Sequence, residues 1–112
     1  MVPSPPPNAA VAELVNAMGE DHVRTLVRTF LRDFPNSMRE LATADRKNGR
    51  RIAHRMKSES RMMGAMNLSR RMLELQERLT PDTGAEINPA DLAALDTEYG
   101  EIAAALRKYV GD

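Results

Sequence analysis

The chain has 112 residues, of which 42% are hydrophobic and 29% charged, and its formal net charge is zero. This length favours one domain that buries roughly two thirds of the surface exposed by the unfolded chain. Cysteine is absent, which excludes a disulfide framework, a thiolate metal site and a thiol nucleophile.

Good helix formers dominate the composition and runs of β-branched residues are missing, which predicts an all-α fold. Residues 1–8 are rich in proline, so we expect a flexible N-terminus there, followed by a helical domain over residues 9–112. The chain shows neither a signal peptide nor an apolar run near the roughly 20 residues that a membrane span requires. We therefore expect a cytoplasmic protein, and a monomer.

The first predicted helix lies between Asn8, a good N-cap, and Gly19, a common helix terminator. Asp21 is expected to cap a second helix that continues to a turn at residues 46–49. Pro35 falls within this second helix, and because the apolar pattern continues past it we expect a kink and not a break. Apolar residues at spacings of three and four predict one buried stripe, formed by Val23, Leu26, Val27, Phe30, Phe34, Met38 and Leu41.

A third helix is predicted over residues 50–63, ending near Gly64, and Asn67 is the expected cap of a fourth. Residues 80–87 are predicted to form a loop. The apolar or small positions that share one face are Ala53, Met56, Ser60 and Met63 in the third helix, and Leu68, Met72, Leu75 and Leu79 in the fourth.

The last helix has the clearest ends, because Asn88 is an N-cap, Pro89 suits the first helical position and Gly111 follows the last apolar residue. Its stripe consists of Leu92, Leu95, Tyr99, Ile102, Leu106 and Tyr109. Four amphipathic helices with short connections pack most simply as an antiparallel four-helix bundle. The short N-terminal helix is expected to cover one end of it.

His54 falls outside the apolar stripe of the third helix, and helical spacing puts it on a neighbouring face with Lys57, Ser58 and Arg61. The formal charge is −2 over residues 1–45, +7 over residues 46–78 and −5 over residues 79–112. The positive segment is centred on His54. It favours an anionic partner surface and a salt-sensitive association.

The segment Ala53-His54-x-Met56-Lys57-Ser58-x-Ser60-x-x-x-Gly64-Ala65-x-x-Leu68 resembles the signature of histidine phosphotransfer (HPt) domains of bacterial phosphorelays, A-H-x-L-K-G-x-[SA]-x-x-x-G-A-x-x-L. Phe30-Leu31-Arg32-Asp33-Phe34-Pro35 is similar to the family's F-L-x-x-x-P stretch, and the resemblance extends from about residue 10 to the end. It implies a helical bundle that accepts a phosphoryl group from a kinase or receiver domain. Such a protein passes the group to an aspartate of another receiver and has no kinase activity of its own.

The resemblance implies that His54 is the phosphoacceptor and that Lys57 contacts the phosphoryl oxygens. The chemistry agrees, because a neutral imidazole nitrogen is a competent phosphoryl acceptor and an ammonium group neutralises phosphoryl charge. Ser58 stands where the family usually has glycine. The expected partner-binding residues are Arg50, Arg51, Ser58, Arg61 and Met62, on a docking surface formed by the second and third helices.

The resemblance also implies partners, namely a response-regulator receiver domain and a sensor histidine kinase, which can be a hybrid kinase. No cofactor is predicted for the chain itself, and Mg²⁺ is expected on the receiver. We predict no binding to nucleic acid or to a membrane.

Other functions fit the sequence less well. A small helical protein that binds nucleic acid, or a scaffold, would use the basic face of the third helix, but no stacking aromatic lies among its arginines. In a dimerising kinase helix an acidic residue normally follows the histidine, whereas Arg55 follows His54. A metal site lacks ligand spacing, because His22 and His54 fall on different predicted helices. His22, with no motif around it, is interpreted as a structural or surface residue.

Overall fold

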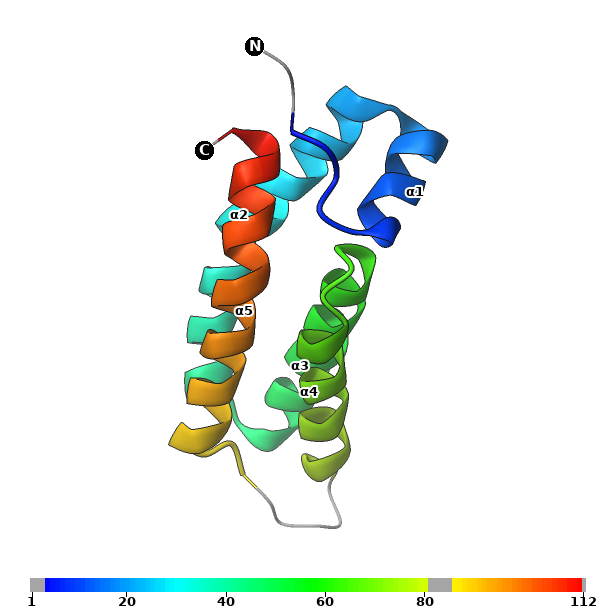
Figure 1. Ribbon diagram of the computed structural model, residues 1–112. Coiled ribbons are helices and arrows are strands. Elements are labelled where there is room, and N and C mark those ends of the chain that lie inside the picture. The colour runs from blue at the N-terminus through cyan, green and yellow to red at the C-terminus, as the bar shows by residue number, and fades with distance from the viewer. Residues whose placement is uncertain (1–3, 81–85, 112) are drawn as a thin grey trace.

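The structure is a computed structural model that describes residues 4–80 and 86–111, and over these residues it contains five α-helices and no strand (Figure 1). Helices that follow one another in the bundle run antiparallel, and α1 lies at one end of it (Figure 1). The predicted all-α bundle with a short extra helix is thereby confirmed. The helices are α1 (Ala9–Met18), α2 (Glu20–Thr43), α3 (Arg46–Met62), α4 (Met66–Arg78) and α5 (Pro89–Val110).

The predicted apolar stripes form the core. All four positions named in the third helix and all four in the fourth are buried, and the stripes of the second and last helices are buried or half-buried. Phe34 of α2 stacks on Tyr99 of α5 with ring centroids 4.8 Å apart, and Phe30 packs 5.0 Å from Phe34. Aromatic contacts therefore join α2 to α5, while α3 and α4 pair as a hairpin.

Two predicted helix starts are confirmed in detail. The Asn8 side chain accepts a hydrogen bond from the Val11 N–H at 2.9 Å and donates one to the Met63 carbonyl at 2.9 Å. The start of α1 is thus tied to the connection between α3 and α4. Asn88 and Asp91 form a reciprocal capping box at the start of α5.

Other predicted boundaries were wrong. Gly19 alone separates α1 from α2, so Asp21 lies inside the first turn of α2 and does not cap it. Residues 46–49 are not a turn but the first turn of α3, which Asp45 caps by accepting from the Asn48 N–H at 2.8 Å. Gly49 suggested a turn but is a packing glycine, because a Cβ there would lie 3.1 Å from the Ile87 side chain.

The fourth helix also begins earlier than predicted. It starts at Met66, with Ala65 as its N-cap residue, so Asn67 belongs to its first turn. The Ser69 N–H donates to the Ala65 carbonyl at 2.9 Å, so helical hydrogen bonding already spans Asn67. Of the predicted loop over residues 80–87, residues 81–85 lie outside the described part of the chain, as do residues 1–3 of the predicted N-terminal segment.

α2 continues through Pro35, as predicted. Proline has no N–H, so the Leu31 carbonyl one turn earlier loses its helical donor. The Tyr99 hydroxyl of α5 donates to this carbonyl at 3.3 Å. The neighbouring helix thereby satisfies the acceptor that proline leaves free, and burial of the phenol raises the pKa of Tyr99.

Tyr99→Phe is expected to lower the free energy of unfolding by about 1 kcal/mol, because it leaves the Leu31 carbonyl without a donor. In a Pro35→Ala background, the N–H of the introduced alanine supplies that donor within the helix. The same Tyr99→Phe change should then cost clearly less, which urea unfolding of the four proteins in this double-mutant cycle would measure. Equal costs in both backgrounds would contradict this role of Tyr99.

Within the described residues, no helix is sufficiently long and apolar to cross a membrane.

Candidate functional site

The candidate site is built on the outer face of α3. Ala53 and Met56 are fully buried, whereas His54 between them is exposed. Helical geometry produces this separation, since residues one and two positions apart point in different directions. The imidazole therefore reaches solvent while its own helix is anchored in the core.

Gln76 of α4 holds the imidazole on one side. The His54 Nδ1 and Gln76 Oε1 atoms lie 3.3 Å apart. With the amide oxygen as acceptor, Nδ1 carries the ring proton and Nε2 keeps its lone pair. The arrangement can therefore present Nε2 to a reacting group while the ring is held at Nδ1.

The neighbouring positions of α3 differ in exposure. Lys57, one turn from His54, is half-buried, and its backbone carbonyl accepts a hydrogen bond from the Ser69 hydroxyl of α4 at 3.0 Å. Ser58 is exposed, and its hydroxyl donates to the His54 carbonyl at 3.4 Å. The Ser58 side chain therefore folds back on its own helix and does not project from the surface beside His54.

A basic groove lies on the α4 side of His54, with a cavity volume of about 580 Å³. Among the lining residues that the structure describes, four are cationic and none is acidic. The charge asymmetry of the sequence thus appears in space as a positive wall beside the imidazole. The basic groove is lined by Arg46, Lys47, Arg50, Arg51, His54, Gln76 and Leu79.

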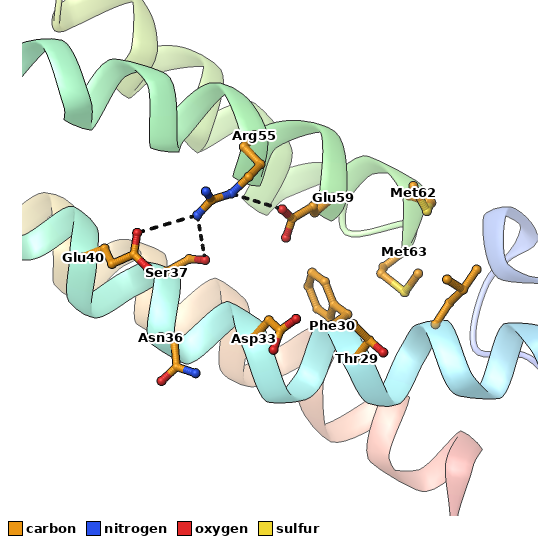
Figure 2. Close-up of a pocket in the computed structure, with 11 residues that line it drawn as sticks. Thr29, Phe30, Asp33, Asn36, Ser37, Glu40, Arg55, Glu59, Met62 and Met63 are labelled. Carbon is orange, nitrogen blue, oxygen red and sulfur yellow. Dashed lines mark hydrogen bonds and ion pairs between the residues drawn. The ribbon is translucent and has the colours of Figure 1, made fainter.

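An acidic groove lies on the other side, between α2 and α3, with a cavity volume of about 530 Å³ (Figure 2). The Arg55 guanidinium donates to the Ser37 hydroxyl at 3.0 Å and pairs with Glu59 at 3.4 Å. The acidic groove is lined by Leu26, Thr29, Phe30, Asp33, Asn36, Ser37, Glu40, Arg55, Glu59, Met62 and Met63. The two grooves flank α3, and they differ in charge.

The structure divides the predicted partner-binding residues among these surfaces. Arg50 and Arg51 line the basic groove together with His54. Met62 lines the acidic groove, while Ser58 and Arg61 are exposed on α3. The predicted partner-binding residues therefore do not form a single patch, and they extend towards α4 as well as towards α2.

Gln76 was missed by the sequence analysis. A signal existed, because His54 and Gln76 lie at nearly equal chain distances from the Gly64-Ala65 connection. Residues at equal distances from the connection of a helical hairpin lie side by side. Finding Gln76 in this way requires that the helices pair as a hairpin and that the connection is located correctly.

Metal binding receives no support from the described residues, among which no group of three or more histidines or acidic residues is placed to hold an ion. His22 is exposed on α2, which agrees with a surface position.

Comparison with protein families gives a match to the family described as Hpt domain, over residues 25–105. This range includes most of α2, all of α3 and α4, and most of α5. Neither the curated proteins nor the solved structures yielded a match to the chain.

Proposed function

Because the chain belongs to the Hpt domain family, whose role is phosphotransfer in phosphorelays, we propose that it accepts a phosphoryl group on His54. The group is exchanged with an aspartate of a response-regulator receiver domain. The observation that carries this proposal is the exposed imidazole held at Nδ1 by Gln76. With Nδ1 donating to the Gln76 oxygen, Nε2 keeps the lone pair that acts as the nucleophile.

The transfer is a displacement at phosphorus. The Nε2 lone pair forms the N–P bond while the bond between phosphorus and the aspartate oxygen breaks, and its electrons return to the receiver's carboxylate. Nδ1 keeps its proton, and the Gln76 oxygen stabilises the positive charge that the ring gains. The reverse steps return the phosphoryl group to a receiver, so no hydrolysis is required.

Other parts of the proposal concern the partners. As a phosphocarrier, the chain needs no kinase activity, and the phosphoryl group originates from a sensor histidine kinase and arrives through a receiver. The Mg²⁺ for the reaction is bound by that receiver. The basic groove attracts the acidic rim of the receiver's metal site and speeds encounter.

The direct experiment offers the purified chain to phosphorylated receivers one at a time. At least one receiver should transfer radiolabelled phosphoryl group to the chain, and the label should be acid-labile and base-stable. Absence of transfer from every receiver of the source organism would refute the proposal.

Lys57→Ala should slow phosphotransfer roughly tenfold to a hundredfold, or about 1.4–2.8 kcal/mol in the barrier, because the ammonium group no longer neutralises the phosphoryl oxygens. Rapid-quench measurement of transfer from a labelled receiver gives this rate. Lys108→Ala, which removes an exposed cation of α5, is the control and should transfer at the normal rate. An unchanged rate for Lys57→Ala would assign Lys57 to the solvated surface.

A further inference from the structure

The acidic groove has apolar residues along its floor and at its edge. Phe30 and Met63 are buried beneath it, whereas Met62 at its edge is 47% exposed (Figure 2). Exposed apolar surface in a concave site is typical of protein contacts, and methionine adapts its shape to a partner at low cost. The floor therefore fits an aliphatic side chain.

The rim of this groove carries more negative than positive charge. Three carboxylates line it, and Arg55 is the single cation among the lining residues in the described part of the chain. Arg55 already forms ion pairs with two of these carboxylates, since its guanidinium lies 3.4 Å from Glu59 and 3.9 Å from Glu40. The third carboxylate, Asp33, pairs at 2.8 Å with Arg32, which is 72% exposed and does not line the groove.

Glu59 is the least exposed of the three carboxylates, since 33% of its side-chain surface is exposed, against 49% for Asp33 and 60% for Glu40. Burial raises its pKa, Arg55 lowers it, and the nearby charge of Asp33 raises it again. The carboxylate has thus lost hydration and received only part of a counter-charge in return. An incoming ammonium or guanidinium group would supply the remainder.

The groove begins beside the phosphoacceptor. Arg55 follows His54 directly in α3, and its side chain points across to Ser37 and Glu40 of α2 (Figure 2). A protein that covers His54 from the α2 side therefore meets the Arg55 end of the groove. The occupant can be sought in the protein that reacts with His54.

We propose that the acidic groove receives a basic amphipathic segment of the phosphotransfer partner, with lysine or arginine side chains at Asp33 and Glu59 and an aliphatic side chain against Met62. This inference rests on the proposed function and specifies its docking. The basic groove on the other side of His54 takes the acidic edge of the same partner. A partner docked in the opposite orientation would meet like charge in both grooves, so the two grooves together fix its orientation.

Binding to the groove can be measured without a partner by labelling the methionine methyl groups for NMR. Met62 and Met63 report on the groove, while Met18 and Met66, which are 39% and 54% exposed, report on other surfaces. The probe is a synthetic amphipathic helix of leucine and lysine, and the matched peptide has glutamate for lysine. We expect the lysine peptide to shift Met62 and Met63 selectively, and the glutamate peptide to shift neither.

The double variant Asp33→Asn and Glu59→Gln should weaken binding of the lysine peptide about tenfold, because two charge pairs with the peptide are lost, one of them at the partly buried Glu59. It should also lower the second-order rate of transfer between His54 and its receiver. The control, Asp96→Asn with Glu101→Gln, removes the same charge from exposed positions of α5 and should change neither quantity. Thermal unfolding verifies that both double variants are folded.

Three results would overturn the inference: equal shifts at all four methionines, unchanged peptide binding and transfer in the Asp33/Glu59 double variant, or a Met62 signal that depends on protein concentration alone. The last result would mean that a second copy of the chain occupies the groove. Failure of the proposed function would be seen in a different experiment, the labelling by phosphorylated receivers, as an absence of label on His54. The methyl shifts do not depend on that reaction, and His54→Gln should leave them unchanged.

Discussion

Replacing His54 by glutamine is expected to abolish labelling by a phosphorylated receiver, since the amide nitrogen of glutamine has no free lone pair to attack phosphorus. The fold should persist, because His54 is exposed and its contact with Gln76 is a single surface hydrogen bond. Radiolabel transfer and the acid and base stability of the product measure the first effect. Circular dichroism during thermal unfolding measures the second.

The matched control is His22→Gln, which changes the other histidine of the chain at an exposed position of α2. It should be labelled like the unmodified protein. Persistent labelling of the His54 variant, or loss of labelling in the His22 variant, would show that His54 is not the acceptor. Gln76→Ala adds a graded test, since it should slow the transfer without abolishing it.

Gly64→Ala should have the largest effect on stability, a loss of about 3 kcal/mol in the free energy of unfolding. Gly64 has a φ of +76°, where an alanine side chain costs roughly 1–2 kcal/mol. A Cβ there would also lie too close to the Asn8 side chain. Asn8 would have to move, and both of its hydrogen bonds, to Val11 and Met63, would be lost.

Substitutions at two other glycines separate the cost of backbone strain from the cost of the clash with Asn8. Gly111 has a φ of +84° with open space around it, so Gly111→Ala measures backbone strain alone and should cost about 1 kcal/mol. Gly100 is inside α5 with nothing near it, so Gly100→Ala should be neutral or stabilise by up to about 1 kcal/mol. Urea unfolding with a constant m value measures all three.

The involvement of Asn8 can be tested separately. Asn8→Ala removes the cap of α1 and should cost about 1 kcal/mol in the normal protein. In the Gly64→Ala background its cost should be much smaller, because the clash has already displaced the side chain. Additive costs would show that Gly64 acts through its backbone only.

The structure also gives reasons for features of the phosphotransfer signature. Gly64 is required by a positive φ and by the close approach of Asn8, and Ala65 is buried in the core. Ser60 is fully buried and satisfies its hydroxyl by donating to the Met56 carbonyl at 2.7 Å. These positions form the hairpin of α3 and α4, and this hairpin brings Gln76 to His54.

Residue patterns along the chain were sufficient to predict the five helices, their buried faces and the exposure of His54. These properties are local: a period of 3.6 residues assigns each side chain to the core or to solvent, whatever the partner helix. The caps at Asn8 and Asn88 were predictable for the same reason, since each side chain bonds to its own helix. The family resemblance added the proposed role of His54 as phosphoacceptor, which periodicity alone does not provide.

Which side chains from different helices meet became known only from the packed bundle. The contact of Gln76 with His54, the hydroxyl of Tyr99 at the carbonyl freed by Pro35, and the packing of Gly49 all depend on the register and rotation of one helix against another. The opposite charges of the two grooves arise in the same way, because each groove combines side chains from two helices. No local period contains that information, since register is set when the whole core packs together.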